Sequence, residues 1–285
     1  MSSNIKYRKL KNSIFHAFIF MVTCIGVIVL AVLLFDILKK GLPWLNMKFL
    51  TGYPSRSAQK SGIWPALIGS FDIILLTVVV SVPVGLGCAI YLEEYAKNNW
   101  LTKLIKINIS NLSGTPSIVY GLLGYAVFAE IFGLGPSLLS GGLTMSLVVM
   151  PIVIVASQEA IKSVPQSLRH GSYALGATKW QTIRKVVLPS AFPGVLTGII
   201  LSISRALGES APLLMVGAFI YVSSPPSGLL DPFTTLPLQI YNWTSKPQKD
   251  FYSVAAAGII VLLALLLTTN AIAIILRNKF QKKME

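Results

Sequence analysis

The chain has 285 residues, enough for one large soluble domain or two small ones, but its composition excludes both. Apolar residues make up 54% of the chain and charged residues only 12%, whereas soluble domains carry roughly 25% charged residues. That leaves too little polar surface to cover a globule in water, and the apolar content also excludes a disordered chain. The composition therefore predicts a polytopic membrane protein.

The formal net charge of +14 does not indicate a nucleic-acid-binding protein. Such proteins gather basic residues on one folded face with aromatic residues between them, whereas here Lys and Arg stand between apolar runs. That distribution is typical of membrane topology. The two cysteines, Cys24 and Cys88, lie inside apolar runs and predict neither a disulfide framework nor a metal site.

Apolar runs of membrane-spanning length recur along the chain. A helix needs about 20 apolar residues to cross the hydrocarbon core, and six runs approach or exceed this length. They cover residues 14–38, 63–92, 112–132, 143–161, 190–222 and 251–276. We therefore expect an all-α membrane protein with six transmembrane helices. Residues that favour interruptions in these helices are Pro83, Gly85, Gly87, Pro116, Pro151, Gly208 and Pro212.

Six spans would place both termini on one side of the membrane. Most basic residues fall in the two tails and in the loops after the second and fourth spans, so we expect both termini in the cytoplasm of a bacterium, with the spans in its plasma (inner) membrane. The loop after the first span opposes this trend with Lys39, Lys40, Lys48, Arg56 and Lys60. We expect two regions. Residues 1–62 would hold a basic tail, the first span and an outer loop, and residues 63–280 a transmembrane core with a cytoplasmic loop at about 162–188.

Enzyme motifs are missing. There is no G-x-x-x-x-G-K-[ST] nucleotide loop and no H-E-x-x-H zinc motif, and His16 and His170 stand far apart in the chain. Residues 208–212 resemble the start of a hydrolase nucleophile elbow but lack its second Gly. We therefore expect no catalytic residues, no metal and no cofactor in this chain.

A charged pair interrupts the fifth apolar run. Arg205 lies 15 residues past Ser190, or about 22 Å at the helical rise of 1.5 Å per residue, which is too deep for easy snorkelling. An Arg at the bilayer centre costs about 2.5–3.5 kcal/mol on insertion scales. Glu209 follows four residues later and Ser202 stands three before, so all three would share one side of a helix.

Two interpretations of this pair remain open. The pair could neutralise itself and fix helix packing, next to a stripe of small residues at Gly194, Gly198, Ser202, Ala206 and Ser210. Alternatively, it marks a water-lined path, because intramembrane ionisable groups usually line pathways. The guanidinium fork matches phosphate-like oxyanions, and a neighbouring carboxylate would moderate that attraction. Arg205, Glu209 and Ser202 are thus the candidate substrate-pathway residues.

The loop at about 162–188 predicts short amphipathic helices. Pro165 can begin one of them, and Gly176 would join it to the next. Apolar side chains stand among basic and polar ones at Leu168, Tyr173, Leu175, Trp180 and Ile183. Such helices either lie on anionic headgroups or dock a cytoplasmic protein.

This loop resembles the EAA loop of binding-protein-dependent ABC importer permeases. It keeps the family's central Gly176 and its closing Leu188-Pro189, with Val186 where the family tends to have Ile. His170-Gly171-Ser172 replaces the opening Glu-Ala-Ala. The resemblance implies that the loop contacts an ATPase through Tyr173, Gly176, Ala177, Trp180, Leu188 and Pro189.

Two further motifs are similar to phosphate importer permeases. Residues 111–121, Asn-Leu-Ser-Gly-Thr-Pro-Ser-Ile-Val-Tyr-Gly, match the start of their third span, and residues 204–214, Ser-Arg-Ala-Leu-Gly-Glu-Ser-Ala-Pro-Leu-Leu, match their fifth-span motif. The Ala-Pro-Leu-Leu ending favours the PstA type over the PstC type. The resemblance covers about residues 60–280.

The resemblance implies an ABC importer permease (MetI-like) fold and a function in ATP-driven import of inorganic phosphate. It implies a PstC-type permease, a PstB-type ATPase dimer that binds ATP, and a PstS-type phosphate-binding protein as partners. The alternatives are a stand-alone anion transporter or channel, or a permease for another oxyanion such as sulfate.

Overall fold

The computed structural model describes residues 2–218 and 222–281, and this part of the chain is helical without a β-strand. The helices are α1 (Ser2–Gly41), α2 (Met47–Thr51), α3 (Trp64–Ile90), α4 (Trp100–Ser113), α5 (Ser117–Gly124), α6 (Leu138–Lys162), α7 (Gln166–Ala174), α8 (Lys179–Thr182), α9 (Leu188–Gly208), α10 (Ala211–Val216), α11 (Leu236–Thr244) and α12 (Asp250–Gln281). Short 3₁₀ or π turns are η1 (Leu42–Trp44), η2 (Ala58–Lys60), η3 (Tyr91–Tyr95), η4 (Tyr125–Ile131) and η5 (Ile183–Val187).

Five helical stretches in the described part of the chain are long and apolar enough to cross a membrane. They are Tyr7–Trp44, Trp64–Tyr95, Leu138–Lys162, Lys179–Gly208 and Asp250–Lys279, at the places of the first, second, fourth, fifth and sixth expected spans. A sixth crossing exists only if the bent pair Trp100–Ser113 and Ser117–Ile131 counts as one span. The all-helical membrane architecture is therefore confirmed.

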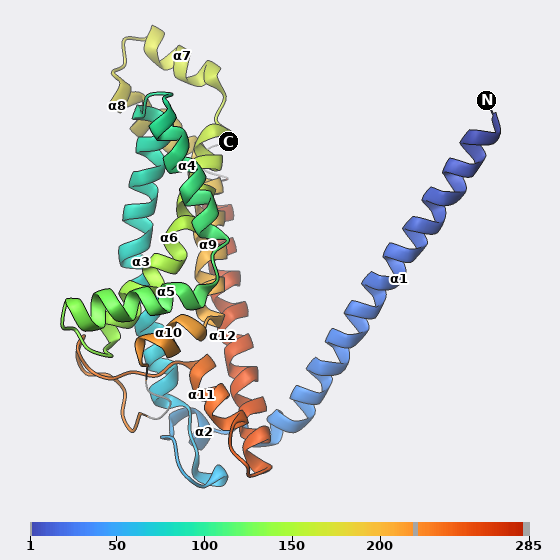
Figure 1. Cartoon of the computed structure of the whole chain (residues 1–285), viewed down its shortest axis with the longest axis vertical. Coiled ribbons are helices and arrows are strands. Elements are labelled where there is room, and N and C mark those ends of the chain that lie inside the picture. The colour runs from blue at the N-terminus through green and yellow to red at the C-terminus, as the bar shows by residue number, and fades with distance from the viewer. Residues whose placement is uncertain (1, 219–221, 282–285) are drawn as a thin grey trace.

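The span expected over residues 112–132 is interrupted at Pro116, as the sequence predicts. The chain bends by 102° between α4 and α5, and Figure 1 shows α5 lying across the long helices. Pro116 causes the break because its ψ of 131° is not helical and proline disfavours the helical conformation in the residue before it. Only the last two residues of α4 therefore fall in the expected span, and α5 with η4 cover residues 117–131 of it.

The span expected over residues 190–222 is also interrupted, after Gly208, as the sequence predicts. The α9 helix ends at Gly208, Glu209 is extended with φ −79° and ψ 131°, and α10 forms a separate short helix. Pro212 explains the break, since its ring would clash with the carbonyl of Gly208 in a continuous helix. The end of the expected span, residues 219–221, lies outside the described residues.

Close contacts between small residues build the centre of the bundle, where α6 packs against α3 and α9. A Cβ atom added at Gly85 of α3 would come 2.9 Å from a side-chain carbon of Val153 on α6. One added at Gly194 of α9 would come 2.8 Å from the Cβ atom of Ala160. The predicted small-residue stripe is thus confirmed at Gly194 and Gly198 as the α9 face that meets α6, but it does not extend to Ser210, which follows the end of α9. Pro83 and Pro151, expected to interrupt helices, do not end α3 or α6.

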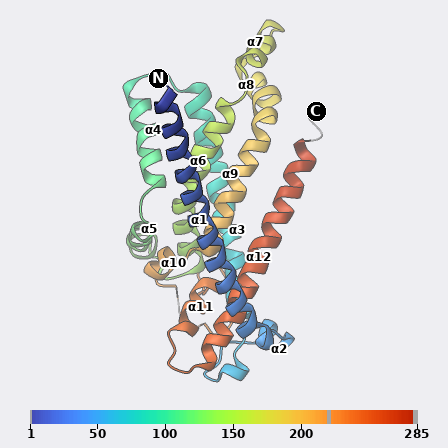
Figure 2. The same ribbon diagram turned by 90° about the vertical axis from the view of Figure 1, so that its right-hand side faces the viewer.

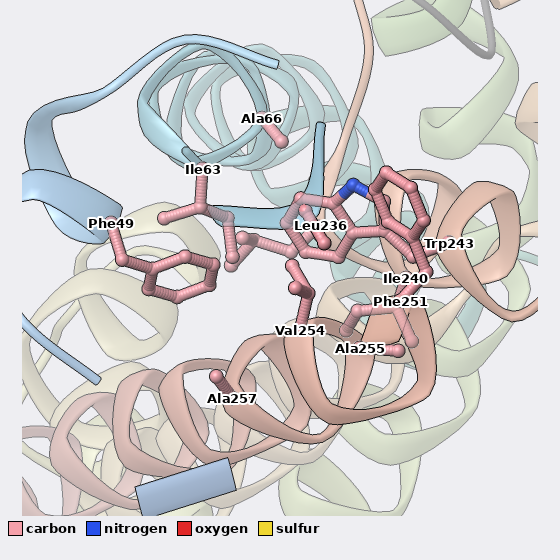
Figure 3. Close-up of a cluster of buried hydrophobic side chains, with 11 residues drawn as sticks. Phe49, Ile63, Ala66, Leu236, Ile240, Trp243, Phe251, Val254, Ala255 and Ala257 are labelled. Carbon is pink, nitrogen blue, oxygen red and sulfur yellow. The ribbon is translucent and has the colours of Figure 1, made fainter. Parts of the chain in front are cut away.

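A second cluster joins the segment after α1 to α11 and α12 at one end of the bundle (Figure 3). The rings of Phe49 and Trp243 lie 5.8 Å apart between centroids, and Ile63 and Phe251 are fully buried beside them. The C-terminal end of α1 is fixed here, since a Cβ atom at Gly41 would come 2.7 Å from the backbone of Ala256. The remainder of α1 diverges from the bundle with its apolar side chains exposed (Figure 1).

The start of α1, the end of α12 and the α7–α8 pair lie at the same end of the molecule (Figures 1 and 2). The cluster of Figure 3 lies at the opposite end. This arrangement agrees with an even number of crossings.

Candidate functional site

Arg205 and Glu209 lie where α9 ends. The Arg205 Nε atom donates to Glu209 Oε1 at 3.3 Å, so the predicted pairing is present. The pair does not lie on a continuous helix, because Arg205 belongs to the last turn of α9 and Glu209 follows the helix end. The helix break therefore leaves the two charges at a helix terminus.

The two partners of this pair differ in exposure. The Arg205 side chain is 46% exposed and that of Glu209 is 19% exposed. Glu209 lines a small cavity together with Ser70 of α3 and Thr235, whose hydroxyl has no hydrogen-bond partner among the described residues. The carboxylate is thus turned towards the bundle, while the guanidinium keeps an accessible surface that a ligand could reach.

Ser202, the third candidate pathway residue, is not brought together with the exposed guanidinium. It is 1% exposed and donates to the Gly198 carbonyl at 2.7 Å. It also lies in the mainly apolar contact between α3, α6 and α9. Its position belongs to the small-residue face of α9, which explains its burial. The structure therefore places Ser202 in helix packing and away from the exposed side of Arg205.

The two sequence motifs around residues 111–121 and 204–214 meet in space. The short helices α5 and α10 that follow the two helix breaks pack against each other. A Cβ atom added at Gly121 would come 2.7 Å from the backbone of Pro212 and from the side chain of Met215. The Arg205–Glu209 pair thus directly precedes α10 in the sequence, next to the contact between α5 and α10.

The loop between α6 and α9 folds as the sequence predicts, into two short helices. The α7 helix begins directly after Pro165, and Gly176 ends it with a φ of +82°. Thr178 then begins α8 with a capping box, accepting from the Gln181 backbone while the Gln181 side chain accepts from Thr178 N–H. A left-handed glycine after a helix and a capped helix start make a tight and well-defined corner.

The candidate contact residues of this loop divide into two groups. Tyr173 and Trp180 are exposed on α7 and α8, as is Leu175 next to the corner. Ala177 lies in the corner after Gly176, while Leu188 and Pro189 form the first turn of α9. Exposed aromatic and aliphatic side chains at the end of a bundle are suited to contact another protein. The α8 helix continues through η5 into α9, so the corner connects directly to the helix that carries Arg205.

Arg169 is a residue of this loop that the sequence analysis did not select. Its side chain is 9% exposed and pairs with Glu94, whose side chain is 8% exposed, at 3.0 Å between Nη2 and Oε1. A signal was present in the sequence, since Glu93 and Glu94 are adjacent acidic residues at the end of an apolar run in a chain with only 10 acidic residues.

Among the described residues, no group of three His, Cys, Asp or Glu side chains comes together in a metal-binding arrangement.

A family model described as "binding-protein-dependent transport system inner membrane component" matches residues 81–282. The chain belongs to this family. The permease therefore contributes a membrane component to a transport system and is not an enzyme.

Curated relatives match most of the permease. A probable ABC transporter permease protein, YqgI of Bacillus subtilis, is 32% identical over 87% of this chain and 88% of its own. The phosphate transport system permease protein PstA of Xylella fastidiosa (strain Temecula1) is 34% identical over 85% of both chains.

Solved structures share the fold of the permease. The structure of a bacterial alginate ABC transporter in complex with an alginate-bound periplasmic protein includes a chain that matches with a TM-score of 0.67 and 14% identity. The match covers 92% of this chain and 93% of that chain. The expected ABC importer permease fold is thereby confirmed.

Proposed function

We propose that this permease is one half of the membrane pathway of an ATP-driven importer of inorganic phosphate. The observation that carries this proposal is the match to phosphate permeases of the PstA type along most of both chains. The motifs at residues 111–121 and 204–214 support it, since they converge where α5 packs on α10.

Arg205 and Glu209 are the proposed pathway residues. Phosphate is an oxyanion, and an Arg fork donates paired hydrogen bonds that match its oxygens. The accessible side of the Arg205 guanidinium can bind such a ligand. The Glu209 carboxylate, with Oε1 at 3.3 Å from Arg205 Nε, neutralises part of the positive charge. A partly neutralised cation holds an anion weakly enough to release it, which a pathway requires. Ser202 supports this site only indirectly, through the packing of α9 on α6.

The α7–α8 pair is the proposed contact for the ATPase. Tyr173, Trp180 and the corner at Gly176 and Ala177 would meet the ATPase, and Leu188 and Pro189 would pass its movement into α9. The chain has no P-loop motif of its own, so the energy of ATP must enter through such a contact.

The proposed partners are a PstC-type permease, a PstB-type ATPase dimer that holds the ATP, and a PstS-type phosphate-binding protein. The proposed orientation places both termini and α7–α8 in the cytoplasm. The basic residues of the N-terminal tail and of the α7–α8 loop support this orientation through the positive-inside rule.

Reconstitution tests this function. The test uses proteoliposomes that contain this permease, its partner permease, the ATPase and the binding protein. They should accumulate labelled phosphate only when ATP is present on the side of the membrane where the ATPase lies. Vesicles with this chain alone should accumulate none. Uptake by the chain alone would support a stand-alone anion transporter instead, and ATP-dependent uptake of sulfate but not phosphate would support a different oxyanion importer.

A further inference from the structure

Arg169 lies at a junction of three helices. From α7, its Nε and Nη2 atoms donate to the same carboxylate oxygen of Glu94 at 3.3 and 3.0 Å. Its Nη1 and Nη2 atoms also donate to the carbonyls of Val164 and Ile161 at 2.5 and 2.9 Å. Ile161 belongs to the last turn of α6 and Val164 to the linker between α6 and α7, while Glu94 belongs to η3 at the end of α3. One buried guanidinium thus joins α7 to both α3 and α6.

The turn that carries Glu94 is itself fixed to its surroundings. The neighbouring Glu93 accepts hydrogen bonds from Lys106 of α4 at 2.7 Å and from Gln158 of α6 at 3.0 Å. The ring of the next aromatic residue, Tyr95, lies 4.9 Å from the Lys179 Nζ atom at the start of α8. The η3 turn therefore contacts α4 and α6 as well as both helices of the α7–α8 pair.

The α7–α8 pair is also closed on itself. The Ser172 and Thr182 hydroxyls are hydrogen-bonded at 2.9 Å, and Thr182 is fully buried. The pair is covalently joined to the bundle at both ends, to α6 through residues 163–165 and to α9 through η5. Arg169 adds a buried connection to η3 at the end of α3, through Glu94.

We propose that Arg169 is a positioning residue that fixes the α7–α8 pair to the end of α3 through Glu94 and to the end of α6 through the Ile161 carbonyl. A movement imposed on α7–α8 then carries α3, α6 and α9 together. Without this connection the movement would pass along the chain into α6 and α9, whereas α3 would be reached only through the contact of Lys179 with Tyr95, and the bundle would not change its access as one body. The inference rests on the proposed function in one respect, that an ATPase moves the α7–α8 pair.

The first test measures the connection itself, in the full complex of this permease with its partner permease and ATPase. Nitroxide labels at Tyr91→Cys on η3 and Ser167→Cys on α7, in a Cys24→Ala and Cys88→Ala background, report the distance between the two elements. We expect one narrow distance distribution that is the same with and without trapped nucleotide. In the Arg169→Gln variant we expect a broader distribution that shifts when nucleotide is trapped.

The second test measures coupling as phosphate taken up per ATP hydrolysed. This ratio is counted per assembled complex, so a lower yield of folded protein does not change it. We expect Arg169→Gln to lower the ratio about tenfold, in the range of ordinary coupling energies. Arg169→Lys, which keeps a positive charge towards Glu94, should restore most of the ratio.

The matched control is Glu159→Gln on α6. Glu159 pairs with Lys162 at 2.8 Å at the same end of the bundle, but this pair is exposed and joins residues of one helix. The control should change neither the distance distribution nor the coupling ratio. If Arg169→Gln does not assemble, Glu94→Gln replaces it, since that variant keeps the bonds from Arg169 to α6. Failure of both to assemble would overturn the proposal, because the pair would then be a requirement for folding.

Two other results would overturn the proposal. One is a distance that shifts with nucleotide in the unmodified permease as much as in Arg169→Gln. The other is an Arg169→Gln variant whose coupling ratio and distance distribution are both unchanged. If the unmodified complex takes up no phosphate, the proposed function fails instead. The distance measurement needs only an assembled complex that traps nucleotide, without phosphate transport, and still decides the role of Arg169.

Discussion

Gly121 of α5 lies directly against Pro212 at the start of α10, so that a Cβ atom at position 121 would come 2.7 Å from the backbone of residue 212. Both helices follow a break, α5 after Pro116 and α10 after Glu209. The contact therefore fixes the relative position of two broken segments, and with them the surroundings of the Arg205–Glu209 pair.

Gly121→Ala should destabilise the permease, because its methyl group would push against backbone atoms that cannot move away. We expect a loss of about 1–3 kcal/mol, as for other overpacked sites. The thermal unfolding midpoint of the purified complex measures this. Gly87→Ala is the matched control, since a Cβ atom at that exposed position of α3 meets nothing within 4 Å. Equal midpoints for the two variants would contradict the close contact between α5 and α10.

Arg205→Ala should reduce phosphate uptake while the complex still assembles. Loss of hydrogen bonds from a charged group is worth about 1.5–3 kcal/mol, or roughly 10- to 100-fold in rate. Uptake by proteoliposomes gives the rate, and size-exclusion chromatography of the complex gives assembly. Arg205→Lys should retain part of the rate, and Arg56→Ala, outside the pathway, should retain all of it. Normal uptake kinetics in Arg205→Ala would remove the residue from the pathway.

Glu209→Gln tests whether the carboxylate moderates the charge of Arg205. Without it the guanidinium should hold the anion more tightly, so that the maximal uptake rate falls by several-fold while assembly is unchanged. Initial rates at saturating phosphate measure the effect. Glu130→Gln is the control carboxylate, since Glu130 accepts a hydrogen bond from Tyr125 on a different segment. An unchanged rate in Glu209→Gln would favour the alternative in which the pair only fixes helix packing.

Gly176→Ala should uncouple ATP hydrolysis from uptake. The backbone at Gly176 has a φ of +82°, and a side chain in this left-handed region costs about 1–2 kcal/mol. The corner between α7 and α8 would then change shape, and less phosphate should enter per ATP hydrolysed, with docking of the binding protein intact. Gly171→Ala is the control, because residue 171 lies in α7 at an ordinary φ with open space around it. Tight coupling in Gly176→Ala would show that the corner is not required for transmission.

The sequence predicted the long helices well because hydropathy alone decides them. A run of apolar residues that cannot be solvated in water must cross the membrane as a helix, since only a helix pairs its backbone groups internally. The corner at Gly176 was also predictable, because few residues other than glycine adopt a positive φ at the end of a helix.

The sequence did not predict which prolines end a helix. Pro83 and Pro151 lie within α3 and α6, which pack along each other, whereas Pro116 and Pro212 stand at helix breaks, at the starts of α5 and α10. The intrinsic cost of each proline is similar, so the packing of neighbouring helices decides whether the helix continues. The sequence marked all four prolines alike as interruptions, which is confirmed at Pro116 and Pro212 and wrong for helix ends at Pro83 and Pro151.

Ser202 and Arg169 show the same limit for the candidate site. Ser202 shares a helix side with Arg205 by spacing, but it is buried because α6 covers that face of α9. Arg169 reads in the sequence as one more basic residue of a cytoplasmic loop. Only the fold brings Glu94, 75 residues earlier, within 3.0 Å of it.

The sequence by itself determined the class of protein, the places of the long spans, the motifs of the permease family and the corner between α7 and α8. These depend on local composition and on the conformation of single residues. The tertiary structure decided where helices break, which face of α9 is covered and which charges meet. Those features depend on contacts between residues far apart in the chain. The energies of such contacts cannot be inferred from a local sequence pattern.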